Sequence, residues 1–339
     1  MKKHDALSEV TSEIITSISK GRENPLTYFD VLYEKVKVLD SVIGSSEIYE
    51  EGKGYQPCLL LDDSSPTYLE DVAVIKKLNP NVSHHCFTGK IKERMMQAFA
   101  AVTERVTTAV FGMPRSGEEI AGEIIQNPQG GEMIRTGTLA FYSRIGQAVS
   151  GISCAHLFYN DPMGSDISIK SWANLPSIGT TTHWNLSPFQ PHYFDALAFR
   201  IRNQALELVD PIPFVQETTW RTDPPPFAWA KGKTTGHPQT HLGHPFPIKM
   251  GNASSPVLGF FVQSTSNPFG KNGDSGSALI FSSNQTYPFN RVDANAHRIA
   301  GVFMGTEEIT GRLPKQVFTA VWRIADSFGL EGLGSLKVA

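Results

Sequence analysis

Short runs of β-forming residues, separated by turn residues, fill the second half of this chain, and this pattern constrains the fold most. The runs are MIRTGTLAFYS, YFDALAFRI, FAWAKGKTTG, LGFFVQS, SALIFSS and RIAGVFMG. Clusters of Gly, Pro, Asn and Ser lie between them, as is typical of an all-β sandwich or barrel. We therefore expect residues 126–339 to form a mainly β unit, with Pro224–Pro226 linking two β lobes.

The first part of the chain has a different pattern. Apolar residues recur at helical spacing in three segments and predict helices there, while CLLLDD reads as a short buried strand. The expected elements are helices over 5–19, 28–42 and 91–110, the strand over 58–63, and a last helix over 318–328 that closes the chain. NPQGGE at 127–132 is a reasonable boundary, so the sequence predicts an α-rich region over residues 1–125 before the β unit of 126–339.

Composition excludes several classes of function. The net charge is -3 and the isoelectric point about 6.4, so nothing favours nucleic-acid binding. No apolar run approaches the roughly 20 residues of a membrane helix, and the first residues lack the apolar core of a signal peptide. Three cysteines among 339 residues indicate a reducing compartment. We expect a cytoplasmic protein.

The stretch KNGDSGSAL places Ser275 between two glycines and behind an aspartate, and two other motifs precede it in the chain. His156 lies in ISCAHLF and Asp195 in YFDALAFRI. A serine hydroxyl becomes nucleophilic when an imidazole accepts its proton, and a buried carboxylate orients that imidazole. The sequence thus predicts the catalytic residues His156, Asp195 and Ser275, with the N–H groups of Gly273 and Ser275 as an oxyanion hole. Asp161, Asp166 and Asp210 are competitors for the role of Asp195.

These motifs make the chain from about 133 to 329 resemble the chymotrypsin-fold, or trypsin-like, serine peptidases. TGTL followed by CAH, FDALAF, GDSGSAL and RIAGVFMG resemble the family's histidine, aspartate, nucleophile and cleft strands, and QVFTAVWRIADSF resembles its last strand and helix. AKGKTTGH is similar to a KxGRTTG strand of the family's disulfide-free intracellular and bacterial branch. The resemblance implies a double β-barrel with the active site between the barrels.

Two departures from the family bear on activation and specificity. Asp274 is present, but no IVGG-like segment that could supply its partner precedes Thr136, so Asp274 is held internally or the enzyme is switched by another event. By the family's spacing, Phe269 stands at the base of the substrate pocket, with Thr306 and Gln316 where glycines are common. No acid is evident there, which favours a small or uncharged side chain, although Glu307 and Glu308 could reach the cleft mouth.

Other motifs have simpler interpretations. GKTTG at 232–236 lacks the first glycine of a phosphate-binding loop, because Phe227 stands there, and is better read as strand and turn. His237, His241 and His244 lie among Pro and Gly and are expected in a loop, and adjacent His84, His85 and Cys86 suit one tetrahedral metal poorly. We predict no metal and no cofactor. Cys154 is expected to be a small buried residue, with a redox-sensitive thiol as the alternative.

The sequence therefore predicts an intracellular, regulated serine endopeptidase that acts on protein or peptide substrates through an acyl-enzyme. The N-terminal region is a candidate contact for a regulatory partner, and neither nucleic acid nor a membrane span is expected. Two alternatives stay open. One is a latent or non-catalytic binding module that keeps the peptidase fold, and the other is a protease that cuts only itself or one partner.

Overall fold

The structure is a computed structural model, and it describes part of the 339-residue chain. The described residues are 39–50, 54–62, 65–78, 83–87, 98–101, 112–126, 132–156, 168–170, 176–185, 194–216, 227–235, 239–248, 257–264, 270–271, 273–307 and 315–339.

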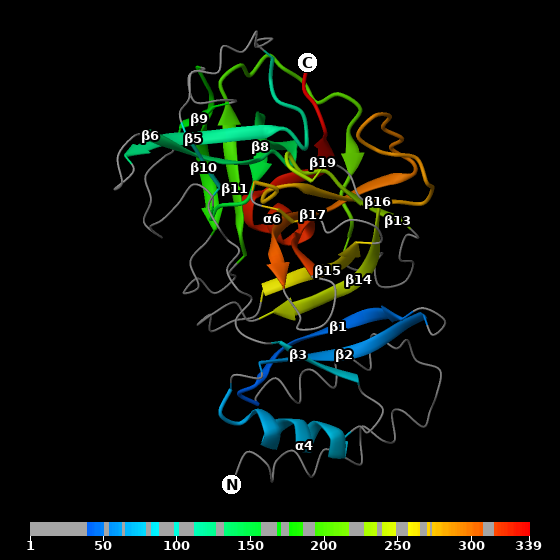
Figure 1. Ribbon diagram of the computed structural model, residues 1–339. Coiled ribbons are helices and arrows are strands. Elements are labelled where there is room, and N and C mark those ends of the chain that lie inside the picture. The colour runs from blue at the N-terminus through cyan, green and yellow to red at the C-terminus, as the bar shows by residue number, and fades with distance from the viewer. Residues whose placement is uncertain are drawn as a thin grey trace.

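The described residues form two β-sheets and two helices (Figure 1). The helices are α4 (Tyr68–Leu78) and α6 (Val321–Phe328). The strands, in chain order, are β1 (Val42–Glu50), β2 (Gly54–Asp62), β3 (Ser83–Phe87), β4 (Ala98–Ala101), β5 (Glu119–Gln126), β6 (Glu132–Thr138), β7 (Phe141–Ile145), β8 (Ala148–Ser153), β9 (Ser168–Lys170), β10 (Ser177–Asn185), β11 (Ala196–Ile201), β12 (Ile212–Pro213), β13 (Phe227–Ala230), β14 (Gln239–Ile248), β15 (Val257–Ser264), β16 (Ala278–Ser282), β17 (His297–Glu307), β18 (Lys315–Ala320) and β19 (Leu330–Ser335).

The two sheets have nine and ten strands, and neither is closed as a whole. The nine-stranded sheet runs in the order β13-β16-β17-β18-β15-β14-β1-β2-β3. Within it, β13 also pairs with β14, so six of its strands form a ring. The ten-stranded sheet runs in the order β12-β19-β7-β8-β11-β10-β9-β5-β6-β4 and stays open among the described strands. The expected mainly β architecture is confirmed, with extended sheets where two separate closed barrels were expected.

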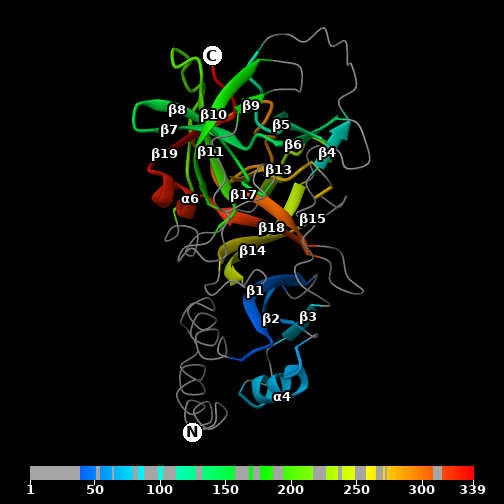
Figure 2. The same cartoon turned by 90° about the vertical axis from the view of Figure 1, so that its left-hand side faces the viewer.

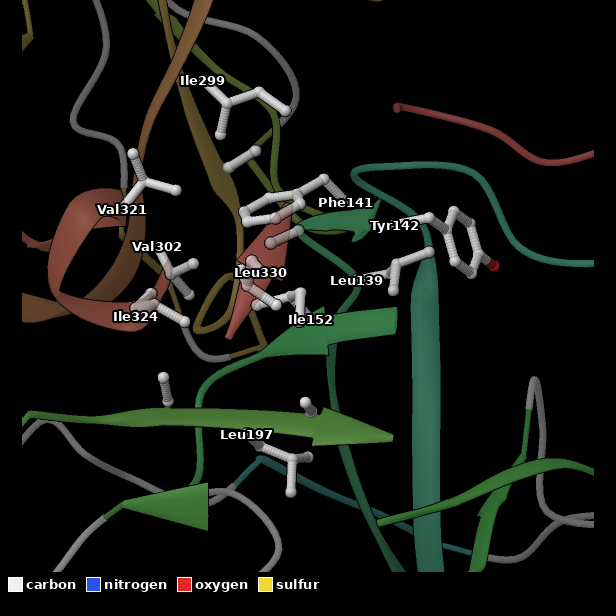
Figure 3. Packing of buried hydrophobic residues seen from close by; sticks show 14 of the residues in the cluster. Leu139, Phe141, Tyr142, Ile152, Leu197, Ile299, Val302, Val321, Ile324 and Leu330 are labelled. Carbon is white, nitrogen blue, oxygen red and sulfur yellow. The ribbon is translucent and has the colours of Figure 1, made fainter. Parts of the chain in front are cut away.

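Strand β16 contributes side chains to two hydrophobic cores, one on each of its faces. Ala278 and Ile280 point into the larger core, whereas Leu279 and Phe281 point into the smaller core of the six-stranded ring. Successive strand residues face opposite sides of a sheet, so β16 is buried on both faces, as the continuous apolar run SALIF indicates. In the larger core, Val321 and Ile324 of α6 lie near Val302 of β17 (Figure 3).

The first three strands extend the nine-stranded sheet beyond the ring. β1 pairs antiparallel with β14 at Gly44 and Ile248, β2 pairs with β1, and β3 runs parallel to β2. Helix α4 covers this extension on the side away from β14 (Figures 1 and 2). Its Ile75 and Leu78 pack on Leu59, Leu61 and other apolar residues in a third cluster. The expected strand at 58–63 is therefore confirmed as the end of β2.

Several expected elements differ from the structure. Residues 98–101 of the expected helix form strand β4, which pairs with β6. The last helix begins at Val321 and not at Phe318, because the preceding segment alternates and pairs with β15 and β17 as β18. Gly329 ends the helix with φ at +70°, and strand β19 follows, so the helix does not close the chain.

His241 and His244 lie in strand β14, where a loop was expected. At the end of the helix expected over 28–42, residues 39–41 form a bend and a turn and Val42 begins strand β1, so this end is not helical. Residues 28–38, the helix expected over 5–19, Pro224–Pro226 and His237 lie outside the described residues. The division of the chain at residues 125 and 126 stays a prediction. None of the described helices is both long and apolar enough to cross a membrane.

A buried histidine predicts the pH dependence of stability. The His297 side chain is fully buried, and its Nδ1 accepts the backbone N–H of Asp293 at 3.1 Å. Burial lowers the pKa of His297 below 6.5, while a bond to the Thr286 backbone and the charge of Asp293 act in the opposite direction. Stability linked to this residue is therefore present above pH 6.5 and lost as the pH falls further, because the unfolded chain takes up the proton first.

We expect the free energy of unfolding, measured by urea denaturation from pH 8 to pH 5, to fall less steeply below pH 6.5 in His297→Asn than in the wild type. One titrating group limits the difference in slope to about 1.4 kcal/mol per pH unit. Asparagine keeps a hydrogen-bond acceptor for Asp293 and does not titrate. Equal slopes in the two proteins would contradict this assignment.

Candidate active site

Pairing of two neighbouring strands brings His156 and Asp195 together. Strand β8 ends at Ser153, three residues before His156, and β11 begins one residue after Asp195. The two strands are antiparallel, with Leu197 opposite Ser153. The end of one strand and the start of the other therefore lie at the same edge of the sheet, and both side chains leave from it.

The carboxylate of Asp195 is fully buried and is satisfied by groups of the histidine segment. Its Oδ1 accepts the backbone N–H groups of Ala155 at 2.7 Å and His156 at 3.0 Å. Its Oδ2 contacts Nδ1 of the His156 ring in a short hydrogen bond. The backbone bonds fix the carboxylate, and the carboxylate in turn fixes the ring so that Nε2 points away from Asp195. The expectation that Asp195 accompanies His156 agrees with this arrangement.

Burial and the charge of Asp195 act in opposite directions on the pKa of His156. Burial by itself lowers the pKa of the imidazole, since it disfavours the charged form. The nearby carboxylate and the hydrogen bond to it raise the pKa, as does Cys154, and the net shift is well above 6.5. An imidazole held in this way is a stronger proton acceptor than one in water.

The turn around Ser275 is built by backbone hydrogen bonds. The N–H of Asp274 donates to the backbone carbonyl of Lys271 at 3.0 Å, and the N–H of Ser277 donates to the backbone carbonyl of Asp274 at 3.0 Å. Gly273 and Gly276 have φ angles of +95° and +90°, which side chains rarely adopt. Within the part of the chain that the structure describes, the N–H groups of Gly273 and Ser275 donate to no protein acceptor.

This turn is fastened to the strands that lead to His156. The N–H of Thr138 donates to the carbonyl of Ser275 at 2.9 Å, and its Oγ1 donates to the carbonyl of Gly273 at 2.6 Å. A Cβ on Gly276 would lie 2.3 Å from Ser153 Oγ and 3.3 Å from the backbone N of Cys154. The Ser275 turn therefore lies against Thr138, Ser153 and the backbone of Cys154, two residues before His156, so the three predicted catalytic residues belong to one region.

Asp274, next to Ser275, is held by a turn from another part of the chain. Its Oδ1 accepts the N–H groups of Thr234 at 2.9 Å and Thr235 at 3.1 Å, and its Oδ2 accepts the N–H of Lys271 at 2.9 Å. The hydroxyl of Thr235 also donates to Oδ2. Burial raises the pKa of Asp274, and these backbone bonds act against that shift.

The GKTTG segment therefore has a structural role that its sequence did not reveal. Residues 233–235 form a turn, as expected, and a Cβ on Gly232 would collide with the Asp274 carboxylate at 2.2 Å. Lys233 contacts Glu119 and donates to Thr136 Oγ1 at 2.8 Å. Of the two options that the sequence left open for Asp274, this arrangement corresponds to an aspartate held internally.

The predicted pocket residues are only partly described. Thr306 on β17 lies opposite Gln316 on β18, and Gln316 is fully buried. Three residues earlier on β17, the carbonyl of Phe303 accepts the N–H of Gly276 at 2.9 Å, so this strand runs directly from the Ser275 turn to Thr306. Phe269 lies outside the described residues.

Asp210 is an exposed residue that pairs with Lys337 at 3.4 Å, which is unsuited to orienting a buried imidazole. Asp161 and Asp166 lie outside the described residues. Sequence reasoning missed Thr138, Ser153 and the turn at 233–235, whose contacts with the Ser275 turn bridge large separations in sequence.

Comparison with known proteins gives similarities only in structure. No protein-family model matches the chain, and no curated protein sequence matches it. Among solved structures, Protease A of Thermobifida fusca is 15% identical, with a TM-score of 0.40 and coverage of 65% of this chain and 98% of that one. A glutamic-acid-specific serine protease is 15% identical at a TM-score of 0.39, covering 65% of this chain and 98% of its own. A chymotrypsin of Cellulomonas bogoriensis is 16% identical, with a TM-score of 0.37, and the match covers 64% of this chain and 96% of that one.

The Thr235 hydroxyl offers a test of the turn that holds Asp274. We expect Thr235→Val to lower the rate at which Ser275 reacts with a fluorophosphonate by about tenfold or more, since a hydrogen bond to a charged group contributes about 1.5–3 kcal/mol. Thr235→Ser keeps the hydroxyl and serves as the matched control. A Val variant that reacts at the wild-type rate, with Ser275 still labelled, would show that this hydroxyl does not hold the turn.

Proposed function

We propose that this protein is a serine endopeptidase that hydrolyses peptide bonds through an acyl-enzyme. The observation that carries the proposal is the fixed pair of His156 and Asp195, with the glycine-flanked Ser275 turn fastened beside it. A buried carboxylate, an oriented imidazole and a serine between positive-φ glycines are the components that acyl transfer needs.

In this proposal, Nε2 of His156 accepts the proton of the Ser275 hydroxyl while Oγ attacks the carbonyl carbon of the peptide. The negative charge that develops on the carbonyl oxygen is received by the N–H groups of Gly273 and Ser275. Nε2 then gives the proton to the leaving amine, and the acyl group remains on Ser275. Water repeats the sequence and releases the carboxylic acid. Asp195 keeps the ring in the tautomer with Nδ1 protonated throughout.

The hold on Asp274 supports an enzyme whose Ser275 turn is formed without cleavage of the chain. Three backbone N–H groups and one hydroxyl already satisfy this carboxylate. The low cysteine content supports action in a reducing compartment such as the cytoplasm. We further propose that the N-terminal region, residues 1–125, contacts a regulatory partner.

Labelling with a fluorophosphonate tests the proposal directly, because this probe reacts only with an activated serine. We expect the purified full-length protein to be labelled as expressed. Ser275→Ala should abolish labelling, and His156→Ala should lower it by at least about 100-fold, as expected for loss of a general base. Asp195→Asn should lower it strongly as well, since the wrong tautomer of His156 is then favoured.

Three results would oppose this function. A folded wild-type protein that is never labelled would favour a latent or non-catalytic module. Labelling that survives Ser275→Ala would identify a different serine. A wild-type protein that is labelled but cleaves only its own chain, with a mass change absent from Ser275→Ala, would favour the self-cutting alternative.

For substrate preference, we propose a small or uncharged side chain before the cleaved bond. Gln316 is buried and neutral, and it lies opposite Thr306 on the strand that leads from the Ser275 turn. Profiling with a peptide library should show cleavage after uncharged residues at rates at least about tenfold above those after Lys or Arg. The opposite ratio would mean that an acid, such as Glu307 or Glu308, supplies the recognition.

A further inference from the structure

The thiol of Cys154 belongs to the same buried cluster as the imidazole of His156 and the carboxylate of Asp195. One ligand atom from each residue lies within 4.8 Å of the other two. Cys154 and Asp195 are fully buried, and His156 is 4% exposed. None of the steps proposed above uses the thiol, so its place in this cluster calls for a separate explanation.

We propose that Cys154, His156 and Asp195 form an inhibitory binding site for Zn²⁺ or a similar soft divalent cation. The inhibitory role of this metal site rests on the proposed peptidase function. Sulfur, imidazole nitrogen and carboxylate oxygen are the three ligand types that zinc prefers. Three protein ligands on a zinc ion leave a fourth position open.

The spacing of the three atoms suits such an ion. Ligand atoms on a tetrahedral zinc are about 3.5 Å apart, since each lies about 2.0–2.3 Å from the metal. No two of the three atoms are more than 4.8 Å apart, so the wider pairs need to close by little more than about 1 Å. With Nδ1 as the ligand, this nitrogen and Oδ2 have to move apart, because they already form a short hydrogen bond. Asp195 is already positioned to be a ligand, because the N–H groups of Ala155 and His156 hold its Oδ1 and leave Oδ2 directed at the ring.

Occupation of this site blocks the proposed reaction through either nitrogen of His156. A metal on Nε2 removes the lone pair that accepts the Ser275 proton. A metal on Nδ1 leaves the imidazole proton on Nε2, which can then no longer accept the Ser275 proton, and it breaks the hydrogen bond with Asp195 that orients the ring. Binding releases the thiol proton to solvent, since zinc is bound by the thiolate. No covalent bond between heavy atoms of the protein is made or broken, so removal of the metal restores His156 as a base.

Metal binding is tested with Co²⁺, which replaces zinc and gives a near-ultraviolet charge-transfer absorption when a thiolate is a ligand. The full-length protein carries Cys58, Cys86 and Cys154. In the double variant Cys58→Ser and Cys86→Ser, only Cys154 remains, and we expect this variant to give the absorption at one Co²⁺ per chain. Cys154→Ala should lose it, whereas the matched Cys86→Ser should keep it. Loss of the absorption from the double variant, or its persistence in Cys154→Ala, would overturn the site.

Inhibition is tested separately with the fluorophosphonate probe. Labelling is measured with and without micromolar Zn²⁺ and expressed as a fraction of each variant's own metal-free labelling. We expect Zn²⁺ to suppress labelling of the wild type at least about tenfold, a chelator to restore it, and Cys154→Ala to be suppressed far less. Suppression that is equal in both proteins would overturn the inhibitory role.

The two measurements separate this inference from the peptidase proposal. Ser275→Ala should bind Co²⁺ with the same absorption although it cannot be labelled. A protein that gives the absorption but is never labelled would refute the peptidase function and the inhibition that depends on it, while supporting the metal site. A protein that is labelled but gives no absorption would refute the metal site and support the peptidase.

Discussion

A buried carboxylate must find hydrogen-bond donors, and the organisation of this site follows from the way Asp195 does so. Its donors are the two backbone N–H groups at Ala155 and His156 and the ring of His156. An unpartnered ion at this depth would cost several kcal/mol, so the segment after β8 is drawn into one conformation. The pairing of β8 with β11 is what makes this conformation available, because it brings both chain segments to one edge of the sheet.

Asp274 is a second buried carboxylate whose charge is satisfied mainly by backbone N–H groups. It lies beside Ser275 at full burial, and a turn at 233–235, forty residues away, supplies most of its donors. Thr138 connects the Ser275 turn to the end of β8, because it bonds to Gly273 and Ser275 and its carbonyl accepts the hydroxyl of Ser153 at 2.8 Å. Hydrogen bonds therefore join the Ser275 turn to the strand that precedes His156.

Much of this could be predicted from the sequence because it depends on local pattern. Alternating and continuous apolar runs predicted β11, β13, β15, β16 and β17, and the order of His156, Asp195 and Ser275 selected the three residues that lie in one region. Two local readings were wrong for a physical reason. AFAA at 98–101 and FTA at 318–320 are short apolar runs that fit a helix or a strand equally well, and both pair with neighbouring strands in the structure. The turn at 233–235 contacts Asp274, and Cys154 lies beside Asp195, across large separations in sequence. Neither contact could therefore be predicted from residue spacing.

The junction between β1 and β14 has a consequence for any shortened form of this protein. Antiparallel pairing at Gly44 and Ile248 makes the N-terminal strands a continuation of the sheet that carries the ring. Without them, part of β14 would become a bare sheet edge, and unprotected edges recruit strands from other molecules. The N-terminal strands thus cover an edge of the sheet that would otherwise be open to self-association, although they contribute no residue to the proposed chemistry.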